Sequence, residues 1–122
     1  MPHRILVIDD EQPILDLMRA ILARDGHEVL CADNGALGLE MYRDKQPNLL
    51  IVDIAMPEVN GYHVLDTVRQ EEGTARHTPI IILTAFPEGV VNQDVDDKGA
   101  DLYLTKPISA AELLEFVKRL LQ

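Results

Sequence analysis

Five short apolar runs, spaced along the whole chain, constrain the fold more than any other feature of this sequence. Few of their residues alternate with polar ones, which is typical of strands buried on both faces of a parallel sheet. The five runs are Ile5–Ile8, Val29–Ala32, Leu49–Val52, Ile80–Leu83 and Leu102–Leu104. A chain with this pattern is expected to build a parallel sheet that helices cover on both sides.

Segments with helical periodicity separate the apolar runs. The second of them is expected to begin at Asn34, a good N-cap, and to end before Pro47. The third is expected over Asn60–Glu72, with Gly73 closing it, and Gly26 is expected to stop the first. The apolar side of that first helix consists of Ile14, Leu15, Met18, Ile21 and Leu22.

The last helix has the clearest predicted start, because Ser109 and Glu112 form a capping box. Residues 87–99, between the fourth and fifth runs, are rich in Gly, Asn, Asp and Val, so any helix there should be short, frayed or mobile. Strand and helix therefore alternate five times. This alternation predicts one α/β domain over residues 1–122, a doubly wound (βα)5 three-layer sandwich around a parallel five-stranded sheet.

Charge and composition exclude several classes of protein. The chain has 21 acidic residues against 11 lysines and arginines, for a net charge of −10. A surface this acidic repels nucleic acid backbones and anionic lipid. No apolar stretch approaches the roughly 20 residues that span a bilayer, and the first residues lack the form of a signal peptide. The one cysteine, Cys31, is interpreted as a small buried apolar residue. We expect a cytoplasmic protein that binds neither nucleic acid nor membranes directly.

Reactive side chains follow the predicted strands at corresponding positions. Asp9 and Asp10 end the first strand and Asp53 ends the third. Thr84 ends the fourth strand, and Lys106 follows the fifth. Because the carboxyl ends of parallel strands lie at one edge of the sheet, these five side chains are expected to converge there.

Three carboxylates in one pocket repel one another, so without a cation at least one of them would tend to be protonated. Mg²⁺ resolves this conflict, since it binds one or two carboxylates together with water and phosphate oxygens. With Thr84 and Lys106 added, the pocket holds the parts of a phosphoryl-transfer site. An aspartate nucleophile there, Asp53, would form a reactive and reversible acyl phosphate.

Each of these residues also has a plainer interpretation. Asp9 or Asp10 could cap the first helix, Thr84 could be an ordinary strand residue, and Lys106 could be an exposed loop lysine. Asp53 could cap a loop, although a carboxylate that ends a buried strand is costly without a function. The interpretation as a phosphoryl-transfer site is preferred because all five residues occur together.

Four motifs in this order resemble the response-regulator receiver family of two-component signal transduction, including its chemotaxis regulators. The resemblance extends over the whole chain and implies a flavodoxin-like fold. The motifs are Asp9-Asp10, Asp53-Ile54-Ala55-Met56-Pro57 followed by Gly61, Thr84-Ala85, and Tyr103-Leu104-Thr105-Lys106-Pro107.

The resemblance assigns a role to each acidic residue of the pocket. Asp53 is similar to the phosphorylated aspartate of the family. Asp10, Asp53 and the backbone carbonyl of Ala55 resemble its direct Mg²⁺ ligands, and Asp9 would reach the ion mainly through water. The chain is thus expected to require Mg²⁺ and to catalyse only its own phosphorylation and dephosphorylation.

The same resemblance implies a switch. Thr84 would donate its hydroxyl to one phosphoryl oxygen, and Lys106 would pair with another. Tyr103 matches the aromatic residue that turns inward when the threonine moves, although simple packing would also explain it. The family further implies a cis peptide bond between Lys106 and Pro107. Ala55 and Phe86 occupy positions that orient the hydrolytic water in relatives, and neither can do so, which predicts slow loss of the phosphoryl group.

The implied partners are a sensor histidine kinase or a phosphotransfer protein, and an output domain or effector protein. The expected output face runs from Tyr103 and Leu104 to Leu114 and Phe116. DNA-binding relatives often carry an arginine at the position of Phe116 for dimerisation, so we expect a monomer or a weak, phosphorylation-dependent dimer.

Three rival functions would each require a different set of residues. An aspartate-nucleophile hydrolase would place a second aspartate two positions after its nucleophile, which Asp9-Asp10-Glu11-Gln12 does not match. A nucleotide or flavin binder would need a glycine-rich first loop. A degenerate receiver that serves only as an interaction module would lack part of the reactive set, which is complete here.

Overall fold

The apolar runs form five parallel strands in the computed structural model, which describes residues 3–85 and 99–122. The sheet order is β2-β1-β3-β4-β5, and every adjacent pair is parallel. The strands are β1 (Arg4–Ile8), β2 (Glu28–Ala32), β3 (Leu49–Asp53), β4 (Ile80–Thr84) and β5 (Leu102–Thr105). From β1 the chain continues to β2 on one side of it and then crosses to β3 on the other side. This change of direction creates a topological switch point at the carboxyl edge of the sheet, beside β1.

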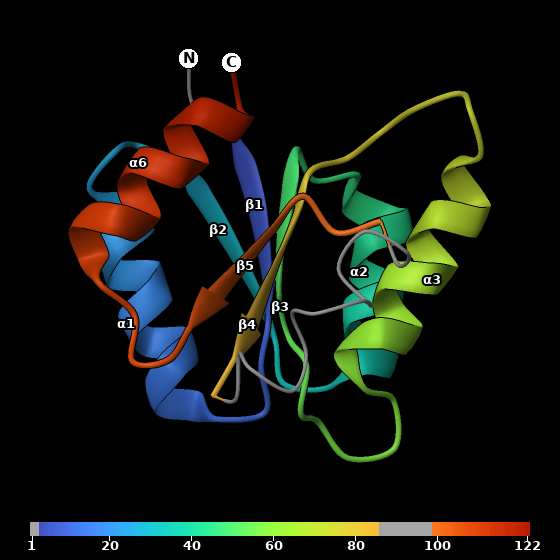
Figure 1. Cartoon of the computed structure of the whole chain (residues 1–122), viewed down its shortest axis with the longest axis horizontal. Helices are drawn as coiled ribbons and strands as arrows, with labels where there is room; N and C mark the ends of the chain where they lie inside the picture. Colours follow the sequence, from blue (N-terminus) through green and yellow to red (C-terminus); the bar gives the residue numbers. More distant parts are fainter. Residues whose placement is uncertain (1–2, 86–98) are drawn as a thin grey trace.

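Helices cover both faces of this sheet, as Figure 1 shows. They are α1 (Gln12–Ala23), α2 (Gly35–Lys45), α3 (Gly61–Glu72) and α6 (Ala110–Leu120). Residues of α1 and α6 share one core cluster with the sheet, and residues of α2 and α3 share the other. The predicted doubly wound, three-layer arrangement is confirmed.

The helix starts follow the predicted caps. The side chain of Asn34 accepts a hydrogen bond from the N–H of Leu37 at the start of α2. Asn60 does the same for His63 at the start of α3, and Ser109 does it for Glu112 at the start of α6. Each side chain thereby satisfies one N–H group that the first turn leaves unpaired, which typically stabilises a helix by about 1 kcal/mol.

Neither Asp9 nor Asp10 is the N-cap of α1, although the sequence allowed that interpretation. Its N-cap is Glu11, which makes no side-chain cap hydrogen bond, and a proline occupies its first turn. Asp9 instead accepts a hydrogen bond from the N–H of Glu11, one residue before the helix. The apolar face was predicted correctly, with Leu15, Met18, Ile21 and Leu22 buried.

Burial on both faces holds for the central strands but not for the edges. Every residue of β3 and β4 is buried, whereas β5 has no buried residue and β2 is buried only at Val29 and Ala32. An edge strand has a neighbour on one side alone, so its side chains are less completely covered. Cys31 on β2 is accordingly half-buried, not fully buried as predicted, and its surroundings raise the pKa of the thiol, mainly through burial.

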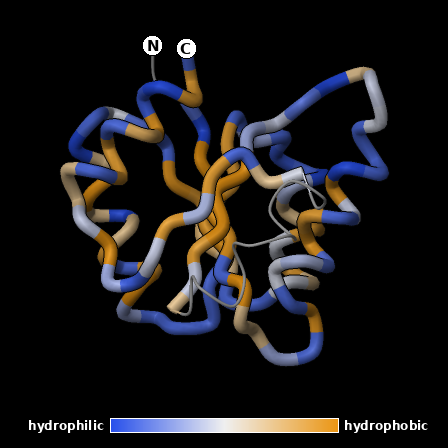
Figure 2. Tube along the Cα trace, in the orientation of Figure 1, coloured by the Kyte–Doolittle hydropathy of each residue, from blue (hydrophilic) through white to orange (hydrophobic). Residues whose placement is uncertain are grey.

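The apolar residues concentrate in the strands at the centre of the molecule, and the polar residues lie mostly in loops and on outer helix faces (Figure 2). Among the described residues, no helix has the length and apolar character needed to cross a bilayer. The predicted fourth helical segment, residues 87–99, lies outside the described residues except for Gly99.

Candidate functional site

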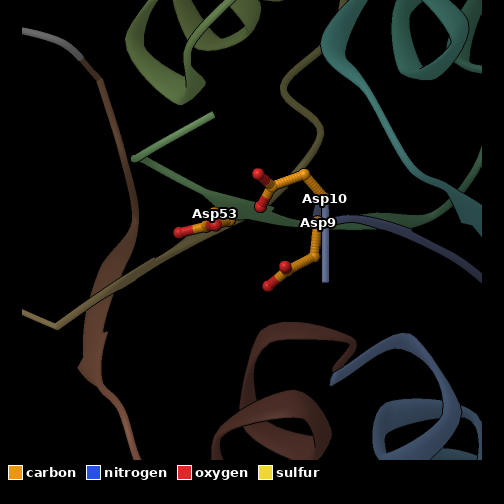
Figure 3. Close-up of side chains that lie close together, drawn as sticks. All are labelled: Asp9, Asp10 and Asp53. Carbon is orange, nitrogen blue, oxygen red and sulfur yellow. The ribbon is translucent and has the colours of Figure 1, made fainter. Parts of the chain in front are cut away.

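The carboxyl edge of the sheet brings the predicted acidic residues together. Asp9 and Asp10 follow β1, and Asp53 is the last residue of β3, the strand paired with β1. One carboxylate oxygen of each lies within 4.8 Å of the others, and Figure 3 shows the three side chains grouped at this edge. Asp9 and Asp53 are buried, while Asp10 is exposed.

Lys106 approaches this group from the end of β5. Its Nζ lies 3.0 Å from Oδ2 of Asp9 and 3.4 Å from Oδ2 of Asp53. The peptide bond between Lys106 and Pro107 is cis, as the resemblance implied. The Lys106 side chain is only 15% exposed, so its ion pairs are shielded from water more than a surface pair would be.

Two further predicted residues, Thr84 and Ala55, line a small cavity at this edge of the sheet. Thr84 ends β4 and is buried. The N–H of Ala55 donates to Oδ1 of Asp53 over 3.3 Å, which fixes the turn after β3. The cavity has a volume of about 200 Å³ and is lined by Asp10, Glu11, Asp53, Ile54, Ala55, Thr84, Ala85 and Lys106.

Tyr103 is not among the residues that line this cavity. Tyr103, on β5, is half-buried and packs against the core cluster that α2 and α3 share with the sheet. Phe86 lies outside the described residues.

The buried carboxylates of the site resist ionisation. Burial, together with the negative charge of Asp9, raises the pKa of Asp53 to about 6, even though Lys106 opposes the change. Burial also raises the pKa of Asp9. For Lys106, burial alone would lower the pKa, but Asp9, Asp53 and Glu11 outweigh it and raise the pKa. One ammonium group therefore does not compensate the acids around it.

This donor set fits a hard divalent cation. The cluster offers oxygen ligands only, from carboxylates whose buried members resist ionisation, and Mg²⁺ binds such ligands in preference to nitrogen or sulfur. The residues that could hold the ion are Asp10 and Asp53, with Ala55 and Asp9 beside them.

One residue of the site was not predicted. Glu11 lines the cavity, and its Oε2 lies 3.4 Å from Nζ of Lys106. The signal was available in the sequence, since Glu11 continues the acidic run Asp9-Asp10, but its contact with a lysine 95 positions away depends on the fold.

Residues 5–118 match the family model of the response regulator receiver domain. The chain belongs to the response-regulator receiver family. The polar-differentiation response regulator DivK of Brucella anthropi is 30% identical over 118 residues, which is 97% of this chain and 95% of DivK. RpaA of Synechocystis sp., a DNA-binding transcriptional regulator, is 38% identical over 121 residues, 98% of this chain.

Solved receiver structures share the fold. The chemotaxis protein CheY4 of Vibrio cholerae superposes with a TM-score of 0.90 at 27% identity, covering 98% of this receiver and 99% of CheY4. The receiver spans nearly all of DivK, but about half (49%) of RpaA and a quarter (25%) of the regulatory protein AtoC of Escherichia coli, to which it is 35% identical. Both stand-alone receivers and longer regulators are therefore among its relatives, consistent with a role in two-component signalling.

Proposed function

We propose that this receiver accepts a phosphoryl group on Asp53 in an Mg²⁺-dependent reaction and thereby switches a partner-binding face. The proposal rests chiefly on one observation, the placement of the Lys106 ammonium 3.4 Å from Oδ2 of Asp53 within a cluster of three carboxylates. Residues 1–122 would act as one domain in the cytoplasm. The phosphodonor would be a sensor histidine kinase, a phosphotransfer protein or a small phosphorylated molecule.

In the proposed reaction an Oδ of Asp53 attacks the phosphorus atom of the donor. The phosphohistidine ring of the donor carries a proton on its other nitrogen. The bond from phosphorus to the phosphorylated nitrogen breaks, its electron pair stays on that nitrogen, and the ring leaves as neutral imidazole. Mg²⁺, when bound, would neutralise charge on the phosphoryl oxygens. Asp10 and the carbonyl of Ala55 would hold the ion together with Asp53, and Asp9 would act on it mainly through water.

Two side chains of the receiver would contact the transferred group. Lys106, whose ammonium already lies among the carboxylates, would pair with one phosphoryl oxygen. Thr84, which lines the same cavity, would donate its hydroxyl to another. Movement of Thr84 toward the phosphoryl group would be relayed to Tyr103 on the neighbouring strand β5.

The output face proposed for this switch lies over β5 and α6. A groove of about 320 Å³ there includes Tyr103, Leu104 and Phe116 in its lining, three of the four residues expected at this face. The fourth, Leu114, packs against the core cluster under α1 and α6. An output domain or an effector protein would bind this groove, with the chain a monomer or a weak phosphorylation-dependent dimer.

Labelling with a small phosphodonor tests the proposal. Acetyl phosphate with Mg²⁺ should add one phosphoryl group, detected by intact mass and mapped to Asp53 by reduction of the acyl phosphate. The label should vanish in EDTA and in Asp53→Asn. A matched control is Asp33→Asn, which removes an exposed carboxylate directly after β2 and should label normally. A wild-type protein that takes no label at any site would instead support an interaction module without phosphorylation.

A further inference from the structure

Hydrogen bonds hold the main chain of Glu11 in place at the rim of the cavity that contains Asp53. Its N–H donates to Oδ1 of Asp9 over 2.9 Å, and its carbonyl accepts hydrogen bonds from Ile14 and Leu15 in the first turn of α1. From this fixed position its carboxylate reaches Nζ of Lys106 at 3.4 Å, although the side chain is 59% exposed. The acid at the mouth of the cavity is thus a consequence of the fold.

Glu11 also decides the net charge around the acceptor. In the part of the chain that the structure describes, Lys106 is the cation in contact with the acids of the site, and it pairs with Asp9, Asp53 and Glu11. Asp10, clustered with Asp9 and Asp53, brings the number of carboxylates at the site to four. A bound divalent cation would leave one of these negative charges uncompensated. Glu11 is the carboxylate that stands outside the group that would hold the metal. Without it, the loaded site would be close to neutral.

We propose that Glu11 is a specificity-determining residue, which disfavours phosphodonors that carry a high negative charge. Two effects act together: its carboxylate repels the incoming anion at the mouth of the cavity, and it competes with the phosphoryl oxygens for Lys106. A donor that brings compensating positive charge, as a phosphohistidine on a cationic protein surface does, is selected over a small dianion. This inference rests on the proposed phosphorylation of Asp53.

Two small donors of different charge separate this effect from a general change in reactivity. Acetyl phosphate is a dianion at neutral pH, whereas the protonated nitrogen of phosphoramidate cancels one phosphoryl charge. In both reactions an Oδ of Asp53 forms a bond to phosphorus as the bond to the leaving group breaks. The electron pair leaves with acetate in one case and with ammonia in the other, so no other reactant is needed.

The experiment compares the wild type with Glu11→Gln at saturating Mg²⁺ and low ionic strength. The labelling rate constant with acetyl phosphate should rise about two- to fivefold in the variant, the range expected for one partly exposed charge. The rate constant with phosphoramidate should rise less. The gain should shrink at about 1 M salt, where the screening length falls to about 3 Å.

Two variants control for charge and for position. Asp16→Asn removes an exposed carboxylate from α1, the helix that follows Glu11, away from the cavity lining, and should leave both rate constants unchanged. Glu11→Asp keeps the charge and should keep the wild-type ratio between the two donors. Equal gains with both donors in Glu11→Gln, or the same gain in Asp16→Asn, would overturn the proposal.

A binding measurement provides a readout that does not depend on turnover. Calorimetric titration with beryllofluoride, an anionic phosphoryl mimic, at saturating Mg²⁺ should give a dissociation constant about two- to fivefold lower for Glu11→Gln than for the wild type. An unchanged dissociation constant would contradict the inference. Failure of the wild type to label on Asp53 with either donor would count against the proposed function itself, so the two failures are distinguishable.

Discussion

The backbone N–H of Lys106 donates a hydrogen bond to the carbonyl oxygen of Thr84 over 2.9 Å. This bond extends the parallel pairing of β4 with β5, in which Thr84 lies beside Thr105. The two side chains proposed to contact the phosphoryl group therefore belong to adjacent, hydrogen-bonded strand ends. Replacing either side chain should leave the backbone of the other in place.

Lys106→Ala should keep Mg²⁺ binding while weakening the response to phosphorylation. The substitution removes a cation that contacts Asp9 and Asp53, so the carboxylate cluster loses a competitor for the metal. Mg²⁺ affinity, measured by NMR titration, should be retained or increased. The change in amide chemical shifts on adding beryllofluoride should be reduced relative to the wild type. Lys118→Ala, on the exposed face of α6, serves as the control. Loss of Mg²⁺ binding in Lys106→Ala would contradict the assignment.

Asp53→Asn should stabilise the protein when metal is chelated. The folded state raises the pKa of Asp53 from 3.8 to about 6, so ionisation of this carboxyl costs folding free energy once the pH exceeds its unfolded pKa. Below about pH 4 the variant and the wild type should therefore have the same free energy of unfolding. The variant should become the more stable protein as pH rises toward 6, and its advantage should stay at about 1–3 kcal/mol above that pH.

Urea unfolding in EDTA across this pH range measures the gain of Asp53→Asn. Saturating Mg²⁺ should reduce it, because the wild type binds the ion more tightly than the variant does. A pH-independent difference between the two proteins would show that the carboxyl is not destabilised by burial.

Glu72→Gln should destabilise the protein most at neutral pH. The Glu72 side chain is 2% exposed and accepts hydrogen bonds from Tyr42 (2.6 Å), from the N–H of Thr78 (2.9 Å) and from Arg76 (3.3 Å). Burial would raise the pKa of this carboxyl, but hydrogen bonds from Thr78, Tyr42 and Arg76 outweigh it and lower the pKa. The stabilisation is present above the unfolded pKa and is lost as pH falls through the lower folded value.

Chemical denaturation at several pH values tests the Glu72 assignment. At pH 7 the cost of Glu72→Gln should be about 2–3 kcal/mol, the range for charged hydrogen bonds, and it should shrink below about pH 4. Glu71→Gln is a matched control, because Glu71 forms an exposed ion pair with Arg43 and should cost at most about 1 kcal/mol. Equal costs for the two variants would argue against the buried cluster.

Gly61→Ala should impair labelling of Asp53 as well as stability. A Cβ at Gly61 would lie 2.5 Å from the carbonyl oxygen of Asp53 and 2.7 Å from Cα of Ile54, so the backbone after β3 would have to move. We expect a loss of about 1–3 kcal/mol, typical of overpacking, and a slower labelling rate with acetyl phosphate. Gly26→Ala is the control: its φ of +81° makes alanine strained, but no atom lies within 4 Å of the new Cβ. It should lower stability without slowing labelling of the folded protein.

Ala55→Asn should shorten the lifetime of the acyl phosphate. Ala55 lines the cavity beside Asp53, and its methyl group cannot hydrogen-bond a water molecule, whereas an asparagine side chain can. The decay of label after removal of donor, followed by intact mass, should be faster in the variant than in the wild type. An exposed alanine elsewhere, changed by Ala36→Asn, should leave the decay unchanged. Equal decay in Ala55→Asn would reject the role assigned to this position.

Local signals along the chain were sufficient to predict most elements of the fold. Asn34, Asn60 and Ser109 each accept a hydrogen bond from the backbone N–H three residues ahead, so their effect on a helix start does not depend on distant contacts. The meeting of Asp9, Asp53, Thr84 and Lys106 was also predictable. Once the strands are taken as parallel, their carboxyl ends have to lie at one edge of the sheet.

Tertiary structure alone decided which acids are buried and what they contact. In the sequence Glu72 looks like its neighbour Glu71, yet α3 packs against α2 so that Tyr42 and Thr78 enclose Glu72 while Glu71 stays exposed. The contact of Glu11 with Lys106 joins the first and fifth strand ends, and no local propensity encodes it. Sequence determines secondary structure through interactions between near neighbours, but burial and charge pairing depend on which surfaces meet when helices and sheet pack together.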